Sequence, residues 1–363
     1  GTSPSTAEVL HPFGDAEVTE VVRTRPDRGV VARGLGRAYG DAAQNAGGVV
    51  LDATALRGVR HLDVERCRAT VAAGTSLDDL MRWLLPAGFF LVTPGTRSVT
   101  VGGAIASDIH GKGHHADGTF GSNVRAITLV DGTGAVRRLT PEETPEEFWA
   151  TTGGMGLTGV ITEAEIDLIP VETAMIRADT ERASDLEDLM ARMDARDDEY
   201  RYSVAWIDCL ATGRSMGRGI LDRGDHARLD ELPPARRADA RRFDPHTVIS
   251  APPIFPSGLV NRWTVGAFNE AWFRKSPKRR EGHLVDIGWF FHPLDLITGW
   301  NRLYGPRGFV QYQFVVPFGQ ERAVQTAVER LSLAGTPSLL AVLKRFGPAN
   351  PGPLSFPQPG WTL

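Results

Sequence analysis

A histidine and a lysine close a run of small residues in the first half of the chain. Residues 94–112 read PGTRSVTVGGAIASDIHGK, and His110 and Lys112 stand at the end of this run. Glycine and alanine leave room for a flat ligand against the backbone. An imidazole and an ammonium beside such a ligand can exchange a proton or hold an anionic group. The run is too long for a simple turn and predicts a binding site. The alternatives are that His110 has a structural role and that Lys112 lies on a surface loop.

Two more glycine-rich stretches flank this run. Residues 32–41 read ARGLGRAYGD and follow an apolar strand, so they fit either a loop whose N–H groups hold a diphosphate or an ordinary tight turn. Residues 153–161 read GGMGLTGVI, in which Gly154, Gly156 and Gly159 match G-x-G-x-x-G. A nicotinamide-binding fingerprint needs a strand before the motif and a helix after it. Here a helix-like stretch precedes the motif and an alternating strand follows it, so we reject that interpretation.

The second half of the chain offers two amides and a lysine. Gln311 and Gln313 lie in the strictly alternating segment 309–316, which predicts a strand with both amides on one face. Such a face recognises hydroxyl groups or is simply solvated. Lys344 projects from a mostly apolar strand predicted to begin at residue 339.

The composition excludes several classes of protein. The 40 basic and 44 acidic residues give a net charge of -4, without the basic excess of a generic nucleic-acid binder. Two cysteines can form neither a disulfide framework nor a four-thiolate metal site. His110, His114 and His115 lie close in sequence, but the glycines between them disfavour a helix and no carboxylate has a suitable offset, so we expect no metal there. No apolar run reaches the roughly 18 residues that a membrane helix needs.

The elements that must position these groups follow from length and hydrophobic spacing. A chain of 363 residues predicts about two domains, with a boundary near residues 170–180, where the composition changes. Residues 77–85 have helical spacing, and Ser76 is a suitable N-cap. The chain begins at Gly1 and stops just after residues 360–361, which resemble the start of a strand, so we expect both ends to be trimmed. Further predicted elements are strands at 29–32, 49–51, 69–73 and 160–168, a hairpin at 123–139 and helices within 181–200 and 321–333.

The three glycine-rich stretches resemble, in sequence and order, the FAD-binding half of the vanillyl-alcohol-oxidase-like flavoproteins. Within them, the chain is most similar to the family that oxidises the 2′-hydroxyl of a polyprenylphosphoryl-ribose. The similarity continues through YSVAWID (202–208), FFHPLD (290–295), GWNRLYGPRGFVQYQF (299–314) and LKRFGPAN (343–350). It covers most of the chain.

This resemblance implies an α+β fold. It implies a two-subdomain FAD-binding domain of the vanillyl-alcohol-oxidase type over residues 1–172 and a substrate-binding domain with a large antiparallel β-sheet over residues 173–363. In the family a final segment returns to the FAD domain and supplies a lysine near the flavin, and that segment is missing here. Non-covalent FAD is implied as well, because Arg37 stands where sugar and lactone oxidases with covalent FAD carry a histidine.

The implied reaction is FAD-dependent oxidation of the 2′-hydroxyl of a polyprenylphosphoryl-β-D-ribose to the 2′-keto sugar. In the family this is the first half of an epimerisation to the arabinose lipid used for cell-wall arabinan. An NAD(P)H-dependent short-chain reductase is the implied partner for the second half. Two alternatives stay open: a soluble alditol or aldonolactone oxidase that uses O2, and a non-catalytic flavin-binding protein of the same fold.

The resemblance also assigns candidate residues, with His110 and Lys112 as the catalytic pair. The candidates for binding the lipid-linked phosphosugar substrate are Trp206, Phe291, Gln311, Gln313, Lys344 and Thr362. Phe291 stands where a mycobacterial family member carries tyrosine, and Thr362 stands in a place usually held by asparagine. The candidates for holding FAD are Gly34, Leu35, Gly36, Arg37, Ala38, Tyr39, Gly40, Gly95, Thr96, Val99, Gly102, Gly103, Ala104, Ala106, Ser107, His110, Gly111, Gly159, Val160 and Ile161.

The densest basic run is RKSPKRR, at residues 274–280. We favour a solvated loop for it; contact with anionic lipid heads is the alternative. The chain's basic residues are mostly arginine, which is typical of a high-GC actinobacterium. Two locations stay open: the cell envelope, on the periplasmic side by the resemblance and with peripheral membrane contact, or the cytoplasm.

Overall fold

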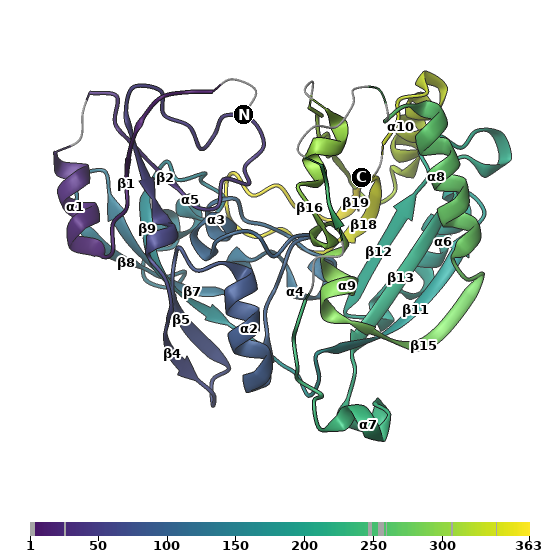
Figure 1. Cartoon of the computed structure of the whole chain (residues 1–363), viewed down its shortest axis with the longest axis horizontal. Helices are drawn as coiled ribbons and strands as arrows, with labels where there is room; N and C mark the ends of the chain where they lie inside the picture. Colours follow the sequence, from purple (N-terminus) through teal and green to yellow (C-terminus); the bar gives the residue numbers. More distant parts are fainter. Residues whose placement is uncertain are drawn as a thin grey trace.

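The computed structural model describes residues 4–24, 27–245, 249–252, 258, 260–305, 308–338 and 340–363. Its two halves lie side by side, with the early, purple and blue part of the chain on the left of Figure 1 and the green part on the right. None of the described helices is both long and apolar enough to cross a membrane.

The first half contains a parallel sheet with the strand order β1-β3-β2 and an antiparallel sheet with the order β4-β5-β9-β7-β8. The strands here are β1 (Glu8–Leu10), β2 (Val30–Arg33), β3 (Val49–Asp52), β4 (Val59–Asp63), β5 (Arg68–Ala72), β6 (Phe89–Phe90), β7 (Val124–Asp131), β8 (Val136–Leu139), β9 (Gly159–Asp167) and β10 (Ile169–Pro170). The helices here are α1 (Asp15–Arg23), α2 (Leu77–Ala87), α3 (Val101–Ala106), α4 (His114–Asp117) and α5 (Pro145–Thr151). Strands predicted at 29–32, 49–51, 69–73 and 160–168 and the hairpin at 123–139 are confirmed within a residue or two.

Helix α2 forms as its sequence predicts and fixes the small-residue run beside it. The Ser76 hydroxyl accepts a hydrogen bond from the Asp79 amide at 3.0 Å, which is the predicted N-cap. The apolar stripe of the helix is fully buried. Its first turn also donates from the Leu77 amide to the Val99 carbonyl at 2.8 Å. The buried helix therefore holds residues 94–112 in place.

The second half is built on a large antiparallel sheet with the order β15-β11-β13-β12-β18-β19-β17, as predicted. The strands here are β11 (Met175–Ala183), β12 (Tyr202–Ile207), β13 (Gly219–His226), β15 (Arg279–Asp286), β17 (Val315–Val316), β18 (Val342–Phe346) and β19 (Gly360–Thr362), with β14 (Ile249–Ser250) and β16 (Ile297–Thr298) paired apart from this sheet. The helices here are α6 (Leu186–Arg196), α7 (Pro234–Arg237), α8 (Arg262–Lys275), α9 (Ile287–Phe291) and α10 (Glu321–Ala334).

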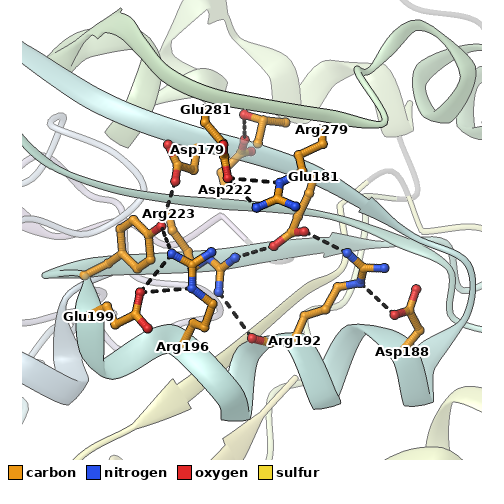
Figure 2. A network of polar contacts seen from close by, with 12 residues as sticks. Asp179, Glu181, Asp188, Arg192, Arg196, Glu199, Asp222, Arg223, Arg279 and Glu281 are labelled. Carbon is orange, nitrogen blue, oxygen red and sulfur yellow. Dashed lines mark hydrogen bonds and ion pairs between the residues drawn. The ribbon is translucent and has the colours of Figure 1, made fainter.

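One face of this sheet packs against α6 and carries a polar network. Figure 2 shows Glu181 of β11 between two guanidinium groups, those of Arg223 on β13 and Arg192 on α6. Arg192 also donates to Asp188 at 2.6 Å. Arg223 is almost fully buried, so its pairing with a carboxylate avoids the cost of an unpaired buried charge. Because side chains alternate along a strand, the residues next to these point to the opposite face, toward the first half.

The segment between β18 and β19 crosses back to the first half, where Asp108 receives it. The yellow trace in Figure 1 extends from the right half toward α3 and α5. The buried Asp108 carboxylate accepts hydrogen bonds from Asn350 Nδ2 at 2.6 Å, from Ser355 Oγ and from the Gly121 amide at 2.9 Å. Asp108 has a φ of 39°, in the region that non-glycine residues rarely adopt. The contacts of this carboxylate join the two halves.

The prediction of one long strand at 309–316 is wrong. Only Val315 and Val316 belong to a strand, β17, and they pair with Thr362 and Trp361 of β19. Phe314 adds backbone hydrogen bonds with Leu363. A strand needs a neighbour for its N–H and C=O groups, and residues 309–313 pair with no strand among the described residues. Of the strand predicted to begin at 339, residue 339 lies outside the described residues, and β18 runs from Val342 to Phe346.

Candidate functional site

His110 lies between side chains contributed by the second half. Its Nδ1 is 3.1 Å from Lys344 Nζ, and its Nε2 is 3.2 Å from Gln313 Nε2. The Gln313 amide nitrogen also donates to Thr362 Oγ1 at 3.1 Å. Lys344 and Thr362 are paired across β18 and β19. The structure thus brings together four residues that the sequence singled out, from segments more than 200 positions apart.

Burial and neighbouring positive charge set the protonation of this cluster. Burial, together with Lys344 and His114, lowers the pKa of His110 well below 6.5. Burial and the charge of Lys112 lower the pKa of Lys344 to about 7. At neutral pH the imidazole is therefore uncharged, with one N–H and one lone pair. Lys344 exists in both forms near neutral pH, within hydrogen-bond distance of the imidazole.

Lys112 occupies a second polar position nearby. Its ammonium donates to the Phe290 carbonyl and lies 4.6 Å from the centre of the Phe290 ring. Burial lowers the pKa of Lys112 to about 8, and the carboxylate of Asp222 opposes this effect. Burial also raises the pKa of Asp222 above its ordinary value, and Asp222 accepts a hydrogen bond from Thr180 Oγ1 at 2.5 Å. Lys112 thus faces the large sheet of the second half, where the Asp222 carboxylate is its countercharge.

Asp222 and Thr180 are residues that sequence reasoning missed. Asp222 lies on β13 and Thr180 on β11, and the two are cross-strand partners. Both face away from α6, because their neighbours Glu181 and Arg223 face toward it. The segment at residues 219–226 has no regular alternation of apolar and polar residues, so no local pattern predicts a strand there. Their pairing depends on two strands about 40 residues apart.

His114 is a buried histidine next to this cluster. Its Nδ1 accepts from the Gly347 amide at 3.0 Å, so its Nε2 carries the hydrogen in the neutral ring. That Nε2 has no hydrogen-bond partner within the described part of the chain. Burial, with Lys344 and His115, lowers the pKa of His114 to about 4. The described residues contain no cluster of three or more metal-ligating side chains.

The glycine-rich stretches meet at this site by close backbone approach. A Cβ on Gly34 would lie 2.3 Å from Thr100 Oγ1, so only glycine lets the 32–41 loop touch the start of α3. A Cβ on Gly111 would lie 2.2 Å from the Thr93 carbonyl oxygen. The third stretch joins them through the Gly153 amide, which donates to the Ile105 carbonyl at 2.9 Å. The three predicted stretches therefore lie together around α3.

The surface formed by these loops fits an FAD molecule. Within the described part of the chain, no backbone amide of residues 35–40 donates a hydrogen bond, so the loop has donors for an anion such as a diphosphate. Gly103 on α3 and Ser107 directly after it form an exposed face of small residues, while the methyl group of Ala104 is buried. That face can accept a flat ring. The free amides of residues 35–40 thus suit the diphosphate of FAD, and the small-residue face at α3 suits its flavin ring.

Several predicted substrate and cofactor residues lie away from the hydrogen-bonded cluster. Phe291 is 2% exposed and packs on Tyr202 with ring centres 4.8 Å apart, beside a cavity of 10 Å³ that has room for about one water molecule. Gln311 is exposed, and Trp206 is half-buried on the site-facing side of β12. Val160 is buried in β9.

The remaining cofactor candidates are placed along the loops. The Tyr39 side chain packs edge-on against Phe309, with ring centres 5.7 Å apart. Thr96 Oγ1 donates to Asp295 at 2.7 Å, which ties its loop to the second half. The Arg37 guanidinium donates to the Leu35 carbonyl of its own loop at 3.1 Å. Ile161, like its neighbour on β9, is buried in the apolar core.

Comparison with known proteins agrees with this geometry. A family model described as an FAD binding domain matches residues 7–140. Decaprenylphosphoryl-β-D-ribose oxidase of Mycolicibacterium smegmatis is 44% identical over 369 residues, which span 100% of this chain and 80% of that protein. D-arabinono-1,4-lactone oxidase of Eremothecium gossypii is 31% identical over 168 residues, which span 44% of this chain and 31% of that protein. The crystal structure of 6-hydroxy-D-nicotine oxidase from Arthrobacter nicotinovorans matches with a TM-score of 0.51 at 23% identity, over 66% of this chain and 53% of that chain.

A chain with this α+β fold and an FAD-binding segment joined to a large antiparallel sheet is an FAD-dependent oxidoreductase. The likeness to the nicotine oxidase concerns the fold alone. The identity that extends over the whole chain is more specific: the protein belongs to the decaprenylphosphoryl-β-D-ribose oxidase family.

Proposed function

We propose that the protein oxidises the 2′-hydroxyl of a polyprenylphosphoryl-β-D-ribose to the 2′-keto sugar. The observation that carries this proposal is the full-length identity to the mycolicibacterial oxidase, in contrast to the lactone oxidase, whose match spans less than half of the chain. The cluster around His110 supports it, because it places proton-exchanging groups beside the surface that fits FAD.

We further propose that residues 1–172 form the FAD-binding unit and that residues 173–363 carry most of the substrate contacts. The 32–41 loop would hold the diphosphate through its free amides, and α3 with Gly111 would support the flavin ring. Attachment would be non-covalent, because arginine at position 37 cannot form the histidyl bond. When bound, FAD supplies the acceptor for the hydride that leaves the carbinol carbon.

The protein's own groups would manage the proton of the substrate hydroxyl. Neutral Lys344 can accept that proton near pH 7, since its pKa is about 7. His110 stays neutral and orients the Lys344 amine through the 3.1 Å contact. Lys112 remains positive over most of the neutral range and would attract an anionic or oxygen-rich part of the substrate. Gln313 and Thr362 would hold sugar hydroxyls.

The proposed product is a keto sugar, so a second enzyme must reduce it to complete an epimerisation. We propose an NAD(P)H-dependent short-chain reductase for that step. The pair would act where the polyprenyl lipid resides, which favours the cell envelope over the cytoplasm.

The test is anaerobic bleaching of the flavin absorbance of the full-length protein. A polyprenylphosphoryl-ribose should bleach it, and free xylitol and gulonolactone should leave it unchanged. Bleaching by the polyol or the lactone alone would identify a soluble sugar oxidase instead. A yellow protein that none of the three reduces would contradict the proposed substrate.

A further inference from the structure

Helix α8 is attached to the protein through one apolar and two polar side chains. Val265 is 1% exposed. Asn269 is 2% exposed, and its amide donates to Asp208 at 2.7 Å. Glu270 pairs with Arg218 at 2.6 Å. Surface helices ordinarily bury an apolar stripe and expose a polar one. On α8 an amide and a carboxylate thus join Val265 in the inward contact.

The outward side of α8 carries three exposed aromatic side chains, with Thr264 and Lys275 exposed among them. Trp263 is 73% exposed, Phe268 49% and Trp272 37%. The rings of Phe268 and Trp272 stack at 6.3 Å with an angle of 10° between their planes. Ala267 and Ala271 lie on the same exposed side. We call these five residues the α8 outer face. Large exposed apolar patches of this kind mark interaction sites in soluble proteins.

The α8 outer face is flanked by positive charge. Residues 262–280 contain six basic residues and one acidic residue, in a chain whose net charge is -4. Lys275, Lys278 and Arg280 are exposed and form no ion pair within the described part of the chain. Figure 1 shows α8 on the outer side of the right half, away from the first half. The prediction that the basic run 274–280 is a loop is wrong for most of it, because Arg274 and Lys275 end α8 and Arg279 and Arg280 begin β15. The run adjoins the exposed aromatic surface of α8.

We propose that the α8 outer face and the basic residues at its C-terminal end form a docking surface for an anionic lipid membrane. Tryptophan and phenylalanine partition into the boundary between headgroups and acyl chains, and lysine and arginine bind anionic headgroups beside them. A second copy of the chain fits less well, because a two-fold contact through this face would bring two copies of the same basic run to one interface. A polyprenyl-linked substrate would reside at such a membrane; this point alone rests on the proposed function.

The experiment is flotation of the full-length protein with vesicles, without substrate. One set of vesicles is phosphatidylcholine, and the other contains phosphatidylglycerol as well. The aromatic variant carries Trp263→Ser, Phe268→Ser and Trp272→Ser. The charge variant carries Lys275→Gln, Lys278→Gln and Arg280→Gln. The matched control is Trp83→Ser, because Trp83 is 45% exposed on α2 in the other half. Melting temperature and flavin content show whether each variant is folded.

We expect the protein to float with the anionic vesicles and not with the neutral ones, and to be released by salt. Removing three cations should weaken the partition coefficient roughly 100-fold, at about a factor of five per cation. The aromatic variant should also lose binding, and Trp83→Ser should keep it. Failure of the unchanged protein to float, or equal binding by folded variants of both kinds, would overturn the proposal. A dimer that only the aromatic variant abolishes, without vesicle binding, would assign the face to a second copy. Because the assay uses no substrate, its outcome does not depend on whether the proposed oxidation is correct.

Discussion

Replacing Lys112 with methionine should shift the pH dependence of flavin reduction to higher pH. Lys344 is the proposed base for the substrate hydroxyl, and its pKa of about 7 means that it titrates near neutral pH. The positive charge of Lys112 is one cause of that low pKa. Without this charge Lys344 holds its proton more tightly, so its pKa rises. The neutral amine that accepts the substrate proton then requires a higher pH.

The size of the shift can be bounded from the structure. The pKa of Lys344 falls from 10.5 to about 7, and burial contributes more to this fall than Lys112 does. Lys112 therefore accounts for less than half of the fall, and we expect the midpoint of the rate profile to rise by about one pH unit. About half of Lys344 is neutral at pH 7 before the change and about a tenth afterwards, which lowers the rate at pH 7 about five-fold.

The assay is stopped-flow bleaching of the flavin at saturating substrate, measured across neutral pH. Lys112→Arg is the matched control, because it keeps the positive charge and should leave the midpoint in place. Lys344→Met should remove this ionisation from the profile. A midpoint that stays or falls in Lys112→Met, or that rises equally in Lys112→Arg, would refute the reasoning.

Three further predictions follow from single contacts. Gly111→Ala should abolish FAD binding, measured by flavin fluorescence, because its Cβ would lie 2.2 Å from the Thr93 carbonyl, whereas Gly266→Ala, on α8 and with no atom within 4 Å of its Cβ, should retain it. Asp108→Asn should lower the free energy of unfolding by about 1–3 kcal/mol in urea titration, because the carboxylate accepts three hydrogen bonds, two of them from Asn350 and Ser355 in the other half; an unchanged midpoint would show that these contacts carry no net stability. Ser76→Ala should cost about 1 kcal/mol through loss of the N-cap, with Ser76→Thr as the variant that keeps the capping hydroxyl.

Local features of this molecule were predictable from the sequence because their causes are local. The α2 stripe, its serine cap and the Asn123–Leu139 hairpin depend on residues a few positions apart. The glycine loops were recognisable for the same reason, because glycine tolerates backbone approaches such as that of Gly111 to Thr93.

Features that depend on distant strand partners could not be predicted in the same way. The alternation at 309–316 is real, but among the described residues of this segment only Val315 and Val316 form a strand, which pairs with β19, and Phe314 bonds to Leu363 beside it. The Asp222–Thr180 pair arises from the register of β11 and β13, to which no short pattern points. Phe291 likewise follows from packing: ring contacts with Phe90 and Tyr202 place it in the core.

The most direct test of the proposed oxidation is a deuterium substitution on the ribose. Polyprenylphosphoryl-ribose labelled at C2′ should bleach the flavin of the full-length protein more slowly than the unlabelled compound, because the C2′ hydride is the one that leaves. Label at C3′ should have no such effect. The account would be contradicted if the C2′-labelled and unlabelled compounds bleached the flavin at equal rates and the C3′-labelled compound lost its deuterium on oxidation.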